Sequence, residues 1–258
     1  MRPVYLALLA GVTCLCACGS LIGKRSDVPE RRKFIIEAAP LRITVPRSAR
    51  PYPYRLEVRE FAVSRMYERD QIVFRLSPEE IREDRWHVWA VRPGQMITDA
   101  IEQYLRDARL FTDIRQEFLD TNPDYSFSGT VNAIERFDSG DQWYARLTLT
   151  MQVMDQQNQI VWRHTFGEQA EQVYNPDFGH TVETMKQLLR RYMEEAIPEI
   201  DLQVHVRMLQ AQNQPYEDLL VAAPAEAATV ADTTAGGSMP GAHPHYEILP
   251  GKVAPDAE

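Results

Sequence analysis

Residues 143–153 read WYARLTLTMQV, and they decide the fold because an apolar side chain occupies every second position. This period predicts a β-strand with one buried face. The alternation recurs in residues 125–133 and 160–166, and the connections between the three segments are short, polar and typical of turns. We therefore expect an antiparallel meander. Its second face carries Arg146, Thr148, Thr150 and Gln152, which predicts a wet face or a polar partner.

Two segments change to a helical period. Apolar residues from Ile97 to Ala108 form one stripe after the loop residues Pro93-Gly94. A second stripe runs from Phe178 to Ala196; Asn175-Pro176 is a capping signal before it, and Pro198 is expected to end it. Residues 200–208 alternate, and they fit either a last strand or a continuing helix, with the strand slightly better by period.

Four shorter strands are expected before the first helix. Residues 34–36 and 54–58 are candidates, and the second breaks near Glu60-Phe61, where a bulge would fit. Residues 72–76 and 85–90 could form a hairpin. The order of elements predicts an α+β fold, a mostly antiparallel sheet with two amphipathic helices on one face.

The N-terminus reads as a lipoprotein signal peptide. One basic residue, Arg2, precedes an apolar run from Val4 to Leu15 that is shorter than the about 20 residues of a membrane-crossing helix. The run ends in Leu15-Cys16-Ala17-Cys18, which resembles the bacterial lipobox. That resemblance implies cleavage between Ala17 and Cys18, and a diacylglyceryl group with a further acyl chain on Cys18. A plain signal peptide with incidental cysteines is the alternative.

The cysteines agree with this interpretation, because all three lie in this region, at positions 14, 16 and 18. The mature domain would hold no disulfide and would depend on a packed core. Gly19, rather than aspartate, after the cysteine favours the periplasmic face of the outer membrane.

The composition divides the chain into four parts. Residues 1–17 are the expected signal peptide, residues 18–33 a polar tether with a basic cluster, and residues 34–211 one domain. Residues 212–258 are rich in Ala and Pro, acidic and poor in large apolar residues, which predicts a disordered tail. The basic cluster could touch anionic headgroups or belong to a solvated linker. The formal net charge is −9, with no basic face that would indicate nucleic acid binding.

The sequence carries no recognisable catalytic constellation. It has no phosphate-binding glycine loop, no nucleophile elbow and no helical His-x-x-x-His pair. His164, between Trp162 and Phe166 on a strand, is expected to be a half-buried histidine rather than a ligand. His243 and His245 could bind a metal weakly from the tail. We expect no enzyme, no metal and no cofactor beyond the covalent lipid.

A succession of short motifs resembles the ABC-type transport auxiliary lipoprotein family, the PqiC-like domain. The motifs are Phe61-Ala62-Val63, then Ile72-Val73-Phe74-Arg75 with phenylalanine where the family has tyrosine, then Trp89-Ala90 with Pro93 and Met96 at the start of a helix. The resemblance covers roughly residues 33–198. The charged stretch 77–85 and the chain beyond Pro198 depart from it.

The resemblance implies a role in transport without chemistry. Family members look like outer-membrane-associated components of transporters built on mammalian-cell-entry (MCE) proteins, which move phospholipid between membranes. The implied partners are an MCE-domain protein, an ABC permease with its ATPase, and other copies of the chain in a ring. Candidate partner contacts are Phe74, Trp86 and Trp89. Trp86 and Trp89 have odd spacing, so one could be core and the other exposed at an interface; a role in the core alone is the alternative. A structural or envelope-assembly lipoprotein without a transporter is the alternative, and an envelope hydrolase is a third hypothesis.

Overall fold

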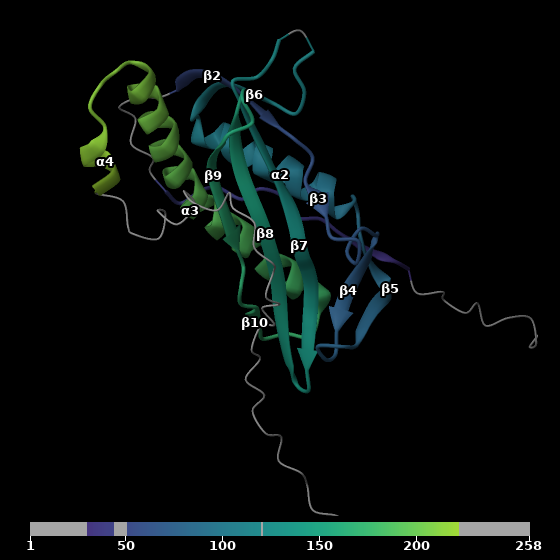
Figure 1. The fold of residues 1–258 in the computed structure, drawn as a ribbon. Coiled ribbons are helices and arrows are strands. Elements are labelled where there is room, and N and C mark those ends of the chain that lie inside the picture. The colour runs from purple at the N-terminus through teal and green to yellow at the C-terminus, as the bar shows by residue number, and fades with distance from the viewer. Residues whose placement is uncertain (1–29, 44–50, 120, 222–258) are drawn as a thin grey trace, which may run out of the picture.

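A computed structural model describes residues 30–43, 51–119 and 121–221 of the chain. Ten strands form one twisted sheet, and the helices α2 and α3 cover one of its faces (Figure 1). The strands are β1 Arg32–Phe34, β2 Tyr52–Val58, β3 Ala62–Val63, β4 Gln71–Arg75, β5 Ile81–Trp89, β6 Phe111–Arg115, β7 Tyr125–Ser139, β8 Gln142–Asp155, β9 Ile160–Phe166 and β10 Glu171–Val173. The helices are α2 Pro93–Ala108, α3 Phe178–Ala211 and α4 Glu217–Val221.

The predicted meander is confirmed. Strand β7 pairs antiparallel with β8 from Tyr125↔Asp155 to Ser139↔Gln142, and β8 pairs antiparallel with β9. The β7–β8 turn contains Gly140 at a φ of 59°, a left-handed conformation that glycine adopts without strain. The predicted hairpin of β4 and β5 is also present.

The sheet is mixed, and the expectation of a mostly antiparallel sheet is wrong. Strands β2, β3 and β4 follow one another along the same edge of β7, all parallel to it, through Leu56↔Tyr125, Ala62↔Thr130 and Val73↔Glu135. Strand β6 is parallel to β2, and β1 is parallel to β5. Alternation shows which residues are buried but not which way a neighbouring strand runs, so the sequence could not distinguish these pairings.

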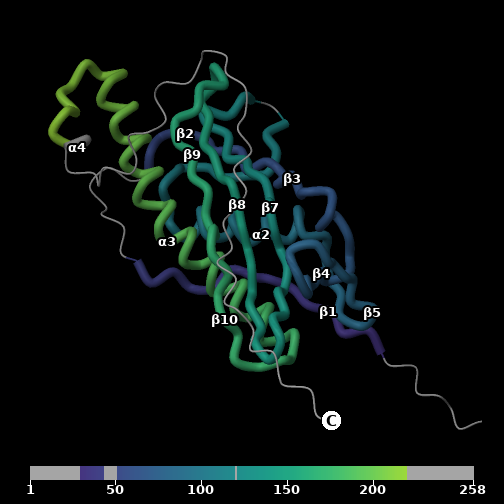
Figure 2. Tube along the Cα trace, turned by 60° about the horizontal axis from the view of Figure 1, so that its bottom comes forward, coloured from purple at the N-terminus to yellow at the C-terminus, as the bar shows by residue number. Residues whose placement is uncertain are grey.

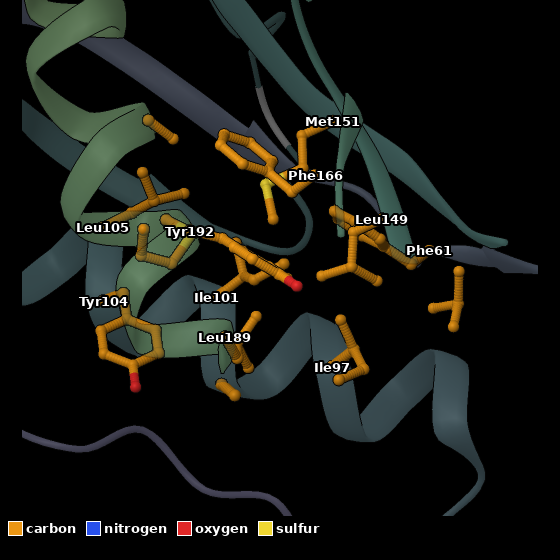
Figure 3. Close-up of a cluster of buried hydrophobic side chains, with 14 of the residues drawn as sticks. Phe61, Ile97, Ile101, Tyr104, Leu105, Leu149, Met151, Phe166, Leu189 and Tyr192 are labelled. Atoms are coloured by element: carbon orange, nitrogen blue, oxygen red, sulfur yellow. The ribbon is translucent and has the colours of Figure 1, made fainter. Parts of the chain in front are cut away.

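Both helices bury the stripes that their sequences predict. Figure 3 shows Ile97 and Ile101 of α2 and Leu189 of α3 converging with Leu149 and other side chains of the sheet. The other labelled residues of this cluster are Phe61, Tyr104, Leu105, Met151, Phe166 and Tyr192.

The start and the end of α3 differ from the prediction. The N-cap is Asp177, whose carboxylate accepts a hydrogen bond from the backbone N–H of Gly179 at 2.7 Å. Asn175 lies two residues earlier, and its side chain accepts from the N–H of Asp177. The helix does not end at Pro198, and residues 200–208 are helical rather than a strand. Ile200 and Val204, one turn apart, are buried at 1% and 0% exposure, so tertiary packing outweighs the proline.

The ordered domain begins within the expected tether, because Arg32 and Lys33 belong to β1. The chain after β1 contacts both long helices: the N–H of Ala39 donates to the Tyr104 hydroxyl at 3.0 Å, and that of Arg42 to Glu194 Oε1 at 2.8 Å. Figure 2 shows this segment running from beside β5 across the molecule towards α3. At the other end, the short helix α4 occupies residues 217–221, which were expected to be disordered. Residues 222–258 lie outside the described residues.

Candidate docking surface

A bulge in β5 turns one predicted contact residue outward. Glu83 of β5 pairs with Val73 of β4, and Val88 of β5 pairs with Gln71 of β4. Between these two pairs β5 is therefore longer than β4, which is the mark of a bulge. The carboxylate of Asp84 holds the extra residues by accepting the backbone N–H groups of Trp86 at 2.7 Å and His87 at 2.8 Å. Trp86 is 40% exposed, which is unusual for so large an apolar side chain.

The other two predicted contact residues are less accessible. Trp89 is 4% exposed and belongs to the core, so it offers no direct contact to a partner. Phe74 is half-buried, and its ring packs edge-to-face on Phe178 of α3, with 6.3 Å between the ring centroids. The odd spacing of the two tryptophans therefore separates a core residue from an exposed one.

Two exposed isoleucines lie on the same margin of the sheet, and we call Ile35, Ile81 and Trp86 the margin residues. Phe34 lies near Gly179 of α3, and alternate side chains of a strand point to opposite faces. Ile35 therefore lies on the face of the sheet opposite the helices, which we call the helix-free face. Ile81 is paired with Arg75, whose side chain reaches Glu135 on that same face.

Basic and acidic side chains border the margin residues; Glu80 and Glu83, near Ile81 in the sequence, are both exposed. Arg31 and Lys33 are exposed beside β5, and Arg85, next to Trp86, is exposed as well. A tryptophan next to arginine and lysine is a combination suited to membrane interfaces and to protein interfaces. No such margin could be predicted from the sequence, because it depends on the parallel pairing of β1 with β5.

The chain enters the domain at this same margin. Arg32 of β1 binds Asp177 at the start of α3 through two contacts of 2.6 and 3.3 Å. The Arg32 guanidinium, and after it the N–H of Gly179, lowers the pKa of Asp177 to about 2. The ion pair fixes where the preceding residues leave the folded domain, next to β5.

The helix-free face is polar and satisfies most of its own hydrogen bonds. Thr150 bonds to Thr165 at 3.0 Å and to Asn132 at 2.7 Å, and the guanidinium of Arg163 donates to Gln152. The prediction of a wet or polar-partnered face for β8 agrees with the half-buried state of Arg146, Thr148, Thr150 and Gln152.

One group on this face was not predicted. Glu135 of β7 is fully buried, and the Tyr67 hydroxyl donates to its Oε2 at 2.7 Å. Arg75 and Arg146 contact its Oε1 at 3.2 and 3.3 Å, and Arg75 also reaches Oε2 at 3.3 Å. The only sequence signal is a charged residue within an apolar run, which is common on half-exposed strands.

One cavity among the described residues has a lining that does not suit a lipid chain. A cavity of about 320 Å³ lies at the start of α2, and charged Glu60, Glu68 and Arg92 help to line it. An acyl chain would require an apolar lining. Among the described helices, none is both long and apolar enough to cross a membrane. Ala17 and Cys18 lie outside the described residues.

The fold and this surface describe a single sheet-and-helix domain with an exposed margin where the chain enters. Comparison with known families is more specific. The model of the ABC-type transport auxiliary lipoprotein component matches residues 37–197, and the chain belongs to that family. This confirms the resemblance carried by the motifs between Phe61 and Met96.

Solved structures resemble the chain at low sequence identity, and two of them have a TM-score of 0.50 or more. A DUF330 protein from Xanthomonas campestris is 17% identical, with a TM-score of 0.56 over 69% of this chain and 98% of its own. An uncharacterized protein is 12% identical, with a TM-score of 0.50 over 66% and 99% of the two chains. A PelC dodecamer from Paraburkholderia phytofirmans is 15% identical, with a TM-score of 0.36 over 55% and 85%. No curated protein matches the chain significantly.

Proposed function

We propose that this protein is the lipid-anchored docking component of an MCE-type ABC transport system, which carries phospholipid between the two membranes of the envelope. Its role is positional and non-catalytic. The observation that carries the proposal is the family match over residues 37–197. In addition, the apolar run near the N-terminus leads into the lipobox-like Leu15-Cys16-Ala17-Cys18.

Acyl chains on Cys18 would fix the domain to one membrane. One chain gives only marginal binding, whereas two or three chains, each contributing about 0.8 kcal/mol per buried methylene, hold stably. Gly19 favours the outer membrane as the site of anchoring. Residues 19–31 then link the anchor to Arg32, and a linker of this length spans about 20 Å on average and about 45 Å when fully extended. The domain would therefore stay close to the membrane surface.

The margin residues are the proposed contact for the transport partner. Trp86 is the residue we expect to contribute most, because large aromatic side chains dominate binding energy at protein interfaces. Its presentation depends on Asp84, which holds the bulge. Other copies of the chain in a ring, with the helix-free face available to them, are part of the same proposal.

The anchor is tested by replacing Cys18 with alanine. We expect Cys18→Ala to leave a folded domain that fractionates with soluble proteins and no longer supports transport. The wild-type chain should stay in the membrane fraction, and mass spectrometry of its N-terminus should find an acylated cysteine. A Cys18→Ala chain that remains firmly bound to the membrane would contradict the anchor.

The contact surface is tested separately in the anchored chain. Trp86→Ala should reduce the amount of MCE-domain protein recovered with the chain at least about tenfold, the scale of an interface hot spot. The matched control is Leu119→Ala, because Leu119 is a large apolar residue that is 85% exposed and lies outside the margin. Recovery of equal amounts of MCE-domain protein with both variants would show that Trp86 is not part of the interface, and it would leave the proposed anchor unchanged.

A further inference from the structure

Three potential metal ligands face one another where the strand β9 meets helix α3. His164 lies on β9, and Glu195 and Glu199 lie on α3. One donor atom from each side chain lies within 4.8 Å of the other two. Because Glu195 and Glu199 are four residues apart on a helix, they share one face of it. The group is therefore built by two rigid elements rather than by loops.

Neighbouring aromatic residues hold two of the three ligands in place. The imidazole of His164 stacks on Phe166 with 4.2 Å between centroids and 12° between planes. The indole Nε1–H of Trp162 donates to Glu199 Oε2 at 2.7 Å. Supporting contacts of this kind orient the ligands of metal sites. Phe166 and Trp162 therefore pack beside two of the three ligands.

The distance between His164 and Glu199 suits two ligands of a small tetrahedral ion better than a direct hydrogen bond. His164 Nδ1 and Glu199 Oε2 are 3.4 Å apart, beyond the usual range of an N–H···O bond. Two ligands of a tetrahedral ion with bonds of about 2.0–2.1 Å lie roughly 3.3–3.4 Å apart. The side chains of His164 and Glu199 are 34% and 32% exposed, and Glu195 is exposed, so the remaining coordination position would open to water.

The charges also favour a cation. Two carboxylates and a neutral imidazole carry a formal charge of about −2 before any ion binds, and a divalent ion would neutralise it. Imidazole and carboxylate together suit Zn²⁺ and the other divalent transition metals better than Mg²⁺ or Ca²⁺, which prefer oxygen ligands only.

We propose that His164, Glu195 and Glu199 form a site for a divalent transition metal, with Zn²⁺ as the ion of reference. The site would have a structural role. Strand β9 pairs only with β8 among the described strands, so its other edge is unpaired, and an ion shared with α3 would hold that edge against the helix. This inference rests only on the geometry of the contact between β9 and α3, and it is independent of the proposed transport function.

The test is a titration of the purified full chain with Zn²⁺, followed by calorimetry, and with Co²⁺, followed by its visible absorption. We expect one ion per chain at this site and, with Co²⁺, the intense absorption of a tetrahedral site. Saturating Zn²⁺ should raise the melting temperature, because an ion that binds only the folded chain stabilises it.

Variants distinguish metal binding at His164, Glu195 and Glu199 from metal binding at other histidines. His164→Ala and Glu195→Gln should each weaken Zn²⁺ binding about tenfold or more and remove the thermal shift; Glu195 is exposed, so Glu195→Gln leaves the fold intact. His180→Ala, at an exposed position elsewhere on α3, and the double variant His243→Ala/His245→Ala in the tail should bind as the wild type does. Absence of binding by the wild-type chain, or loss of binding only in the double tail variant, would overturn the proposal.

Discussion

Tyr67 donates its hydroxyl to Oε2 of Glu135 across 2.7 Å, which ties the loop between β3 and β4 to the central strand β7. Glu135 is fully buried and also contacts Arg75 and Arg146. Burial, and after it the nearby carboxylate, raises the pKa of Tyr67, so its hydroxyl remains a donor throughout the physiological range. This contact joins the loop that precedes β4 and β5 to β7, the strand that pairs with most of the sheet's first strands.

Replacing Tyr67 by phenylalanine should therefore destabilise the fold. Tyr67→Phe removes the shorter of the two donors to the buried Oε2 of Glu135 and leaves only the 3.3 Å contact from Arg75, which should cost about 1–3 kcal/mol. Urea unfolding should show this loss in the free energy of unfolding. Tyr174→Phe is the control, because Tyr174 is 87% exposed and the change should have no measurable effect. Equal stability of the two variants would mean that the Tyr67–Glu135 bond contributes nothing net.

The Arg32–Asp177 pair predicts a change in acid titration. The folded pKa of Asp177, about 2, is below its ordinary value of 3.8, so the stabilisation from this group is complete above pH 3.8 and is lost as the pH falls towards 2. In Arg32→Ala we expect the pKa of Asp177 to rise towards 3.8 while remaining below it, because Gly179 still donates. NMR titration of the carboxyl measures this shift. An unchanged pKa would show that β1 is not held against α3 in solution.

Gly129 is predicted to be intolerant of any side chain. A Cβ at this position would lie 2.4 Å from both the ring of Phe61 and the carbonyl oxygen of Thr150. Gly129→Ala should cost more than the about 1–3 kcal/mol typical of an overpacked core, because one of the two contacts is backbone. At Gly140 a Cβ would meet nothing within 4 Å, so Gly140→Ala should cost only the about 1–2 kcal/mol of a left-handed residue. Thermal unfolding that ranks the two variants in the opposite order would contradict this packing.

Pro198 is predicted to weaken the helix that contains it. It has no N–H for the carbonyl of Glu194, and proline inside a helix costs about 3 kcal/mol relative to alanine. Pro198→Ala should raise the free energy of unfolding, by about 1–3 kcal/mol, without reducing the helical circular dichroism. A loss of stability would instead show that the local geometry imposed by the proline is required for the packing of Ile200 and Val204.

The parts of the fold with strong periodicity could be predicted from sequence. The meander of residues 125–166 and the helix after Pro93 follow from side-chain spacing alone, because a buried face fixes that spacing. Residues 200–208 fit a strand slightly better than a helix by period, and the packing of Ile200 and Val204 decides for the helix. Parallel pairing along β7 depends on the path that the chain takes between strands. The spacing of apolar residues within one strand contains no information about that path.

The candidate surface divides in the same way. The odd spacing of Trp86 and Trp89 allowed one of them to be exposed without predicting it, and which of the two is exposed depends on the bulge at Asp84. Glu135 and the group of His164 with Glu195 and Glu199 were not anticipated. Each joins residues that are distant in sequence and become neighbours only through the mixed sheet and the unbroken α3.

The central claim is that an anchored chain of this family docks a transport system. The most direct measurement is purification of the full-length chain from cross-linked membranes, followed by identification of the proteins recovered with it. The account predicts an MCE-domain protein together with an ABC permease, in amounts that fall when Trp86 is replaced by alanine. Recovery of the acylated chain with neither of these proteins would contradict it.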